Sequence, residues 1–244
     1  MSITCKNCNN VFEGNFCNNC GQSASVKRIN WKYIYDDVKG NYVSFNKTKF
    51  YSAKELLFRP GFLIRDFLSG KRVNFYKPVS LVLFVASVYA YLFHTFNINP
   101  YSVSQSGIGD VNIYKFNIIH EWINSHFSIS SLISVPIISV TAFLLFKKQN
   151  LNFSEYLVIN TFLAAQRIII RIVFFPVMLI MNYTHHLNYI FQFLSVADIA
   201  LMVWAFYQMF ENISLLNVIL KVLLIYLISF ILTLAGFVMV FLIL

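Results

Sequence analysis

The chain has 244 residues, of which 58% are hydrophobic and only 12% are charged, and its mean hydropathy is +0.63. Soluble domains carry about 25% charged residues. Too few charges are present to cover the surface of a soluble protein of this size. The composition therefore excludes an ordinary soluble domain and indicates an integral membrane protein.

The net charge of +9 is concentrated in the first third of the chain. Residues 1–77 hold 13 Lys and Arg against 5 Asp and Glu, whereas residues 78–244 hold 6 against 5. Positive charge next to a membrane span favours the cytoplasmic side and contact with anionic lipids. Nucleic-acid binding is the alternative for a basic segment, but these charges cluster directly before the first apolar span, so we do not expect a nucleic-acid partner.

All four cysteines lie in the first 20 residues, as two Cys-x2-Cys pairs: Cys5, Cys8, Cys17 and Cys20. This spacing is typical of a tetrahedral four-thiolate zinc site, with iron as the alternative metal. Gly21 and Asn9 follow the pairs and tolerate the positive φ that such turns need. Because residues 1–24 are too few to form a hydrophobic core, we expect a structural Zn²⁺ to stabilise them as a zinc ribbon.

Residues 25–77 are expected to form cytosolic or interfacial amphipathic helices. The first, within 29–45, has Asn30 as its cap, and Asp36 and Asp37 are interpreted as solvated helix residues. A capping box at 52–55 predicts the start of the second helix, and Pro60 separates it from a third that ends at Gly70. We expect these helices to lie on the inner leaflet with their phenylalanines in lipid. The bases expected to contact lipid headgroups are Arg59, Arg65, Lys71, Arg72 and Lys77.

Two juxtamembrane motifs, KELLFRPG at 54–61 and GKRVNFYKP at 70–78, follow the cysteine pairs. Over residues 5–92 this order resembles a bacterial family of uncharacterised multi-pass membrane proteins with an N-terminal zinc ribbon. The resemblance implies a membrane location and the four cysteines as metal ligands, and it brings no activity. The family signature has no assigned role and falls on Arg59, Pro60, Gly61, Arg65, Gly70, Lys71, Arg72, Tyr76 and Pro78.

The apolar body, residues 78–244, predicts an all-α integral membrane bundle of about five transmembrane helices, since a span needs about 20 apolar residues. The expected spans are 78–97, 127–146, 157–181, 187–210 and 218–244. The Lys and Arg distribution places the N-terminus in the cytoplasm and the C-terminus in the periplasm of an inner membrane. Four spans remain the alternative, because the third contains Arg167 and Arg171. An interfacial helix is expected at 118–123 in the long outer loop.

The expected polar cluster inside the membrane consists of Gln166, Arg167, Arg171 and Asp198. Arg167 and Arg171 share a helix face, and a rise of 1.5 Å per residue places Arg171 and Asp198 at one depth on neighbouring spans. We predict an ion pair between them, because an unpaired charge at this depth is costly. Its role is either a structural link between helices or a polar pathway or anion site.

No catalytic motif is recognised, and three classes of function remain. The first is a non-enzymatic adaptor or regulator that displays the zinc ribbon to a cytosolic protein partner. The second is a pore-forming, homo-oligomeric or accessory membrane protein of a phage-defence system, such as RNA-targeting CRISPR. The third is a transporter or lipid-modifying enzyme that uses Arg167, Arg171 and Asp198.

Overall fold

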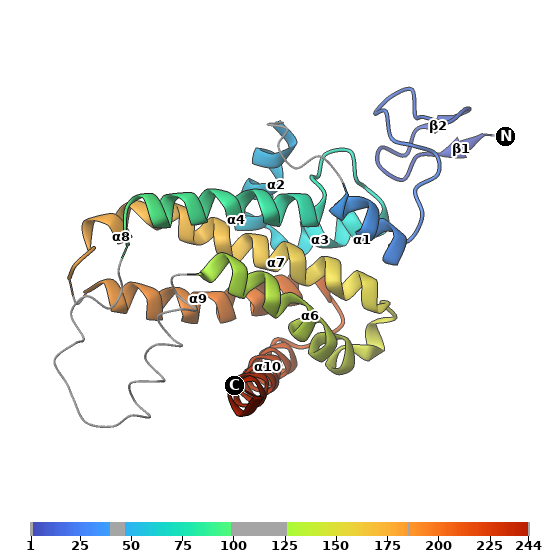
Figure 1. Ribbon diagram of the computed structural model, residues 1–244. Helices are drawn as coiled ribbons and strands as arrows, with labels where there is room; N and C mark the ends of the chain where they lie inside the picture. Colours follow the sequence, from blue (N-terminus) through green and yellow to red (C-terminus); the bar gives the residue numbers. More distant parts are fainter. Residues whose placement is uncertain (1, 40–46, 99–125, 185, 244) are drawn as a thin grey trace.

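The computed structural model describes residues 2–39, 47–98, 126–184 and 186–243. Within these ranges the chain is almost entirely helical, apart from a small hairpin at the N-terminus. Figure 1 shows this hairpin at one end of an elongated helical body. The helix expected at 118–123 lies outside the described residues.

The N-terminal ribbon consists of strands β1 (Ile3–Thr4) and β2 (Val11–Phe12), which pair antiparallel. Asn9 and Gly21, the residues after the second cysteine of each pair, have φ values of +59° and +74°. Both positive φ values were expected. Cys5, Phe12 and Cys17 form a buried cluster separate from the main core.

Three short helices connect the ribbon to the first span: α1 (Trp31–Val38), α2 (Lys47–Phe58) and α3 (Pro60–Ser69). Asn30 caps α1 by accepting a hydrogen bond from the Tyr33 backbone N–H, Pro60 begins α3, and Gly70 ends it at φ +106°, all as predicted. The predicted capping box was wrong. Ser52 lies inside α2, where its hydroxyl is buried and accepts a hydrogen bond of 2.8 Å from the Tyr76 backbone N–H.

Five helices are long and apolar enough to cross a membrane. They are α4 (Pro78–Thr95), α6 (Phe127–Leu145), α7 (Phe153–Val173), α9 (His186–Met209) and α10 (Leu215–Ile243). A short 3₁₀ turn, η1 (Lys147–Gln149), follows α6, and α8 (Phe175–Ile180) follows α7. The third predicted segment is therefore a candidate span, which begins four residues earlier than expected and ends before α8.

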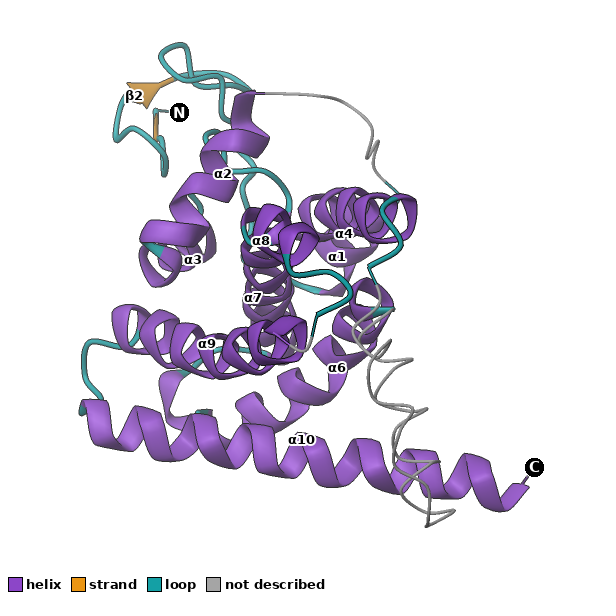
Figure 2. Cartoon of the chain, turned by 90° about the vertical axis from the view of Figure 1, so that its left-hand side faces the viewer, coloured by secondary structure: helices purple, strands orange, loops and turns teal. Residues whose placement is uncertain are grey.

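Helix α7 is the centre of the body. It is the most buried of the five spans, and it contacts α2, α3, α4, α6 and α9. In Figure 2, α4, α6 and α9 surround α7 and α8, which are seen close to end-on. The helix that carries both intramembrane arginines is thus the one most shielded from lipid.

Helix α10 departs from the common direction of the other spans. It is seen almost end-on in Figure 1, where α4, α7 and α9 are seen from the side, and it is seen from the side in Figure 2. It packs mainly against α6 and α9, and it is the least buried candidate span. Because helix tilt is set by packing against neighbours, the few contacts of α10 allow a large angle between it and α4, α7 and α9.

The apolar side of α3 is buried in protein, which corrects the expectation that it lies in lipid. Leu63, Ile64 and Phe67 are all about 1% exposed, and the Phe67 ring meets Phe162 of α7 edge-on at 5.1 Å. The reason is tertiary: α3 packs against α9 and α7.

Gly61 allows α3 to approach α9 closely. A Cβ atom at this position would lie 2.4 Å from the Ala205 carbonyl oxygen and 2.4 Å from Cβ of Gln208. The Gly61 backbone N–H also donates to Oε1 of Gln208 at 3.0 Å. A glycine is therefore required here by close packing of two backbones.

Candidate metal centre and intramembrane polar cluster

The four cysteine sulfurs converge on one point. All four lie within 4.8 Å of one another. The Cys5 and Cys20 sulfurs are 3.5 Å apart, and those of Cys8 and Cys17 are 3.6 Å apart. A tetrahedral Zn²⁺ with Zn–S bonds of about 2.3 Å separates its sulfurs by about 3.8 Å. The four thiols therefore fit a metal ion of this kind with little movement.

The turns of the two cysteine pairs direct backbone N–H groups at the sulfurs. Burial opposes ionisation of Cys5 and Cys17, but N–H groups two and three residues further on outweigh it and lower both pKa values, that of Cys17 to about 6. The Gln22 backbone N–H lowers the pKa of Cys20, but burial and the neighbouring sulfurs raise it to about 11. A bound cation removes the repulsion between thiolates, so this geometry favours metal binding.

The ribbon is attached to the turn that follows α3. Oε1 of the buried Gln22 accepts a hydrogen bond of 3.1 Å from the Arg72 backbone N–H. The Arg72 guanidinium donates to the Lys27 carbonyl at 2.9 Å and lies over the rings of Tyr33 and Phe67. Arg72 therefore joins the ribbon, its linker, α1 and α3.

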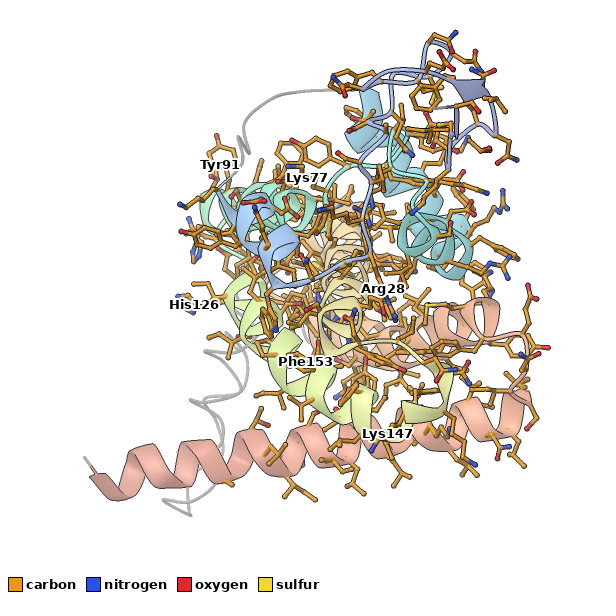
Figure 3. All side chains as sticks on the ribbon, turned by 90° about the vertical axis from the view of Figure 1, so that its right-hand side faces the viewer. Arg28, Lys77, Tyr91, His126, Lys147 and Phe153 are labelled. Atoms are coloured by element: carbon orange, nitrogen blue, oxygen red, sulfur yellow. The ribbon has the colours of Figure 1, made fainter. Side chains whose placement is uncertain are left out.

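A second attachment joins the linker to the start of α7. Arg28 donates two hydrogen bonds of 2.7 Å to the buried carboxylate of Glu155 and a third to the Asn150 carbonyl. Glu155 and Asn152 form the capping box of α7, and Asn152 also donates to the Ile29 carbonyl at 3.0 Å. Figure 3 shows Arg28 over the start of α7, beside Phe153. The linker that follows the ribbon is thus held at the start of the helix that carries the intramembrane arginines.

The five bases expected at lipid headgroups have different environments. Arg72 has the protein partners described above, and Lys71 pairs with Asp66 at 2.9 Å. Arg65 pairs with Glu211 and, like Arg59, lies over the ring of Phe62. Lys77 is the residue before α4. All five lie on the segment that joins the ribbon to the bundle, and the side chains of Arg65, Lys71 and Arg72 have protein partners.

Asp37 is a buried polar contact that the sequence did not reveal. It was interpreted as solvated, but it is 1% exposed and accepts hydrogen bonds from the Val79 backbone N–H at 2.9 Å and the Ser80 hydroxyl at 2.6 Å. It thereby caps α4 from another helix. Burial raises the pKa of its carboxyl, against the lowering effect of these hydrogen bonds. No local pattern identifies such a cap, because its partners are some 40 residues away.

The predicted ion pair between Arg171 and Asp198 is present. Nη1 and Nη2 of Arg171 donate to the two carboxylate oxygens of Asp198 at 3.1 and 2.9 Å, and the two side chains are 4% and 9% exposed. The Arg171 guanidinium also lies 3.5 Å from the centre of the Phe127 ring. The pair joins α7 to α9 in the bidentate geometry that is most favourable for arginine.

Gln166 and Arg167 lie beside this pair but bind different partners. Nε2 of Gln166 donates to the Leu56 carbonyl of α2 at 2.8 Å, so this amide attaches α2 to α7. Nη2 of Arg167 lies 3.5 Å from the Ser134 hydroxyl of α6. Both residues line a small cavity together with Asp198. The structure therefore brings the predicted cluster together, with Gln166 committed to helix packing.

These features define a chain with five candidate membrane spans and a four-thiolate cluster that could hold a metal ion. Residues 50–90 match the model of a family described as "Protein of unknown function (DUF3667)". The matched segment includes most of α2, all of α3 and the first part of α4, and it contains both juxtamembrane motifs. No curated protein and no solved structure matches the chain.

Proposed function

We propose that this protein is a non-enzymatic adaptor or regulator of the inner membrane that displays a zinc ribbon to a cytosolic protein partner. The observation that carries the proposal is the attachment of a four-thiolate ribbon to α3 and α7 through Arg72 and Arg28. A closed four-thiolate shell leaves no open coordination position, so Zn²⁺ here stabilises the ribbon and takes no part in catalysis.

Charge supports the orientation with the ribbon in the cytoplasm. Lys77, Lys147 and Lys148 lie at the end of the bundle that carries the ribbon, where α4 and α7 begin and α6 ends; Lys77 and Lys147 are labelled in Figure 3. Positive charge at one end of a bundle favours the cytoplasmic side. The reducing cytoplasm keeps the four thiols available for metal, and five spans then place the C-terminus in the periplasm.

Exposed apolar side chains on the ribbon supply a contact surface. Val11 and Phe16 are 61% and 67% exposed, and Ile3, also in the ribbon, is 38% exposed. Exposed apolar groups on so small a unit are typical of protein-binding surfaces. We assign the cytosolic partner to this surface, and Arg59 and Arg65 at the rim of α3 to contact with anionic lipid headgroups.

The test compares proteins cross-linked to the full-length chain in intact cells with those cross-linked to a variant carrying Val11→Ser and Phe16→Ser. A matched control carries Phe50→Ser, which removes an aromatic ring of equal exposure from α2. The proposal predicts that the partner is lost in the double ribbon variant and retained in the control, with equal zinc content in all three. An identical set of cross-linked proteins in all three would contradict the adaptor role.

A further inference from the structure

Arg167 is a cation within a candidate membrane span, and the described residues supply no counter-ion for it. Its Nη2 atom reaches the Ser134 hydroxyl only at 3.5 Å, and its buried Nε atom has no hydrogen-bond partner. Over the described ranges, no carboxylate forms an ion pair with Arg167, whereas Arg171 takes both oxygens of Asp198. The cluster therefore carries a net charge of +1 in a region where uncompensated charge is strongly disfavoured.

A cavity between α6, α7, α9 and α10 lies against this cation. Its volume is about 10 Å³, which is room for one water-sized particle. Tyr226 and Asn160 line it, and Oδ1 of Asn160 has no hydrogen-bond partner among the described residues. Buried polar atoms are rarely left unpaired in native proteins. The unpaired groups around this cavity therefore point to an occupant.

We infer that this cavity binds one monatomic anion of the halide class, held by the Arg167 guanidinium together with the hydroxyl of Tyr226. An anion neutralises the excess charge, which a water molecule does not. The volume excludes a phosphate or a lipid headgroup, each of which has at least five heavy atoms.

The neighbouring groups are compatible with an anion. The negative charge of Asp198 is directed at Arg171, so the pair presents a neutral wall to the cavity. Oδ1 of Asn160 is an acceptor and takes no part in holding the ion, while Nδ2 of Asn160 is occupied by Ser139 and the Tyr156 carbonyl. The donors available to the ion come from two helices, Arg167 from α7 and Tyr226 from α10.

The experiment is a chloride titration of the purified full-length protein in detergent, followed by the ³⁵Cl NMR line width, with gluconate used to keep the ionic strength constant. The wild type is expected to broaden the chloride signal saturably, and bromide is expected to reverse the broadening. Absence of saturable broadening in the wild type would overturn the proposal.

Variants locate the site. Arg167→Gln is expected to weaken chloride binding at least tenfold, whereas Lys32→Gln, which removes an exposed cation from α1, is expected to bind like the wild type. Tyr226→Phe removes one hydroxyl with little change of shape and is expected to weaken binding severalfold. If Arg167→Gln is not recovered as a folded protein, Tyr226→Phe decides, and unchanged affinity in it would overturn the assignment. Unchanged affinity in folded Arg167→Gln would do the same.

Discussion

Asp198→Leu leaves the Arg171 guanidinium buried without its counter-ion. The pair is bidentate at 2.9 and 3.1 Å, and both side chains are less than a tenth exposed, so solvent does not compensate for the loss. Breaking a buried pair on one side costs about 3–5 kcal/mol. We expect Asp198→Leu and Arg171→Met each to lower the free energy of unfolding by an amount in this range.

The double variant Arg171→Met with Asp198→Leu replaces both charges by apolar groups of similar volume. Such a replacement is often close to neutral, because the desolvation of both charges is removed together. The double variant is therefore expected to be much more stable than either single variant. A matched cycle on Arg65 and Glu211, an exposed pair, is expected to give a coupling of about 0–1 kcal/mol.

The assay is reversible unfolding in mixed micelles, followed by circular dichroism and analysed as two double-mutant cycles. The reasoning predicts a large coupling for the intramembrane pair and a small one for the exposed pair. If the losses in the two single variants simply add in the double variant, the two charges are not coupled and the structural role assigned to the pair is wrong.

Three further predictions concern the N-terminal segments that precede the first candidate span. Gly61→Ala is expected to destabilise the protein by about 1–3 kcal/mol, because its Cβ overlaps Ala205 and Gln208 of α9, as measured by the unfolding midpoint. Arg28→Met removes both hydrogen bonds to Glu155 and is expected to increase amide hydrogen exchange in the ribbon linker while leaving that of the spans unchanged; equal exchange in both proteins would refute the attachment. Because the pKa of Asp37 is raised on folding, the folded state holds its proton more tightly, so wild-type stability relative to Asp37→Asn is expected to rise as the pH is lowered from 7 toward 4.

Features encoded by local sequence could be predicted. The spacing of the four cysteines defines the metal cluster, and apolar length defines the five spans. The caps at Asn30, Pro60 and Gly70 depend on a few neighbouring residues, so they were also recognised. The pairing of Arg171 with Asp198 followed from helix rise alone, since the two helices are joined by a short connection.

Features that depend on distant segments could not be predicted. Glu155 is placed by its own helix, but its partner Arg28 lies 127 residues earlier in the chain. The burial of α3 follows from its packing against α7 and α9. An amphipathic pattern does not show whether the apolar side of a helix contacts protein or lipid. The large angle between α10 and the other candidate spans depends on its limited packing, and hydropathy carries no information about helix tilt.

The most direct test of the account is the metal content of the purified full-length protein, measured by mass spectrometry of zinc, iron and protein sulfur in one sample. The account predicts one zinc ion per chain, and loss of that zinc in Cys5→Ser and in Cys17→Ser with the membrane helices still folded. Protein that contains stoichiometric iron, or no metal while the ribbon remains folded, would contradict it.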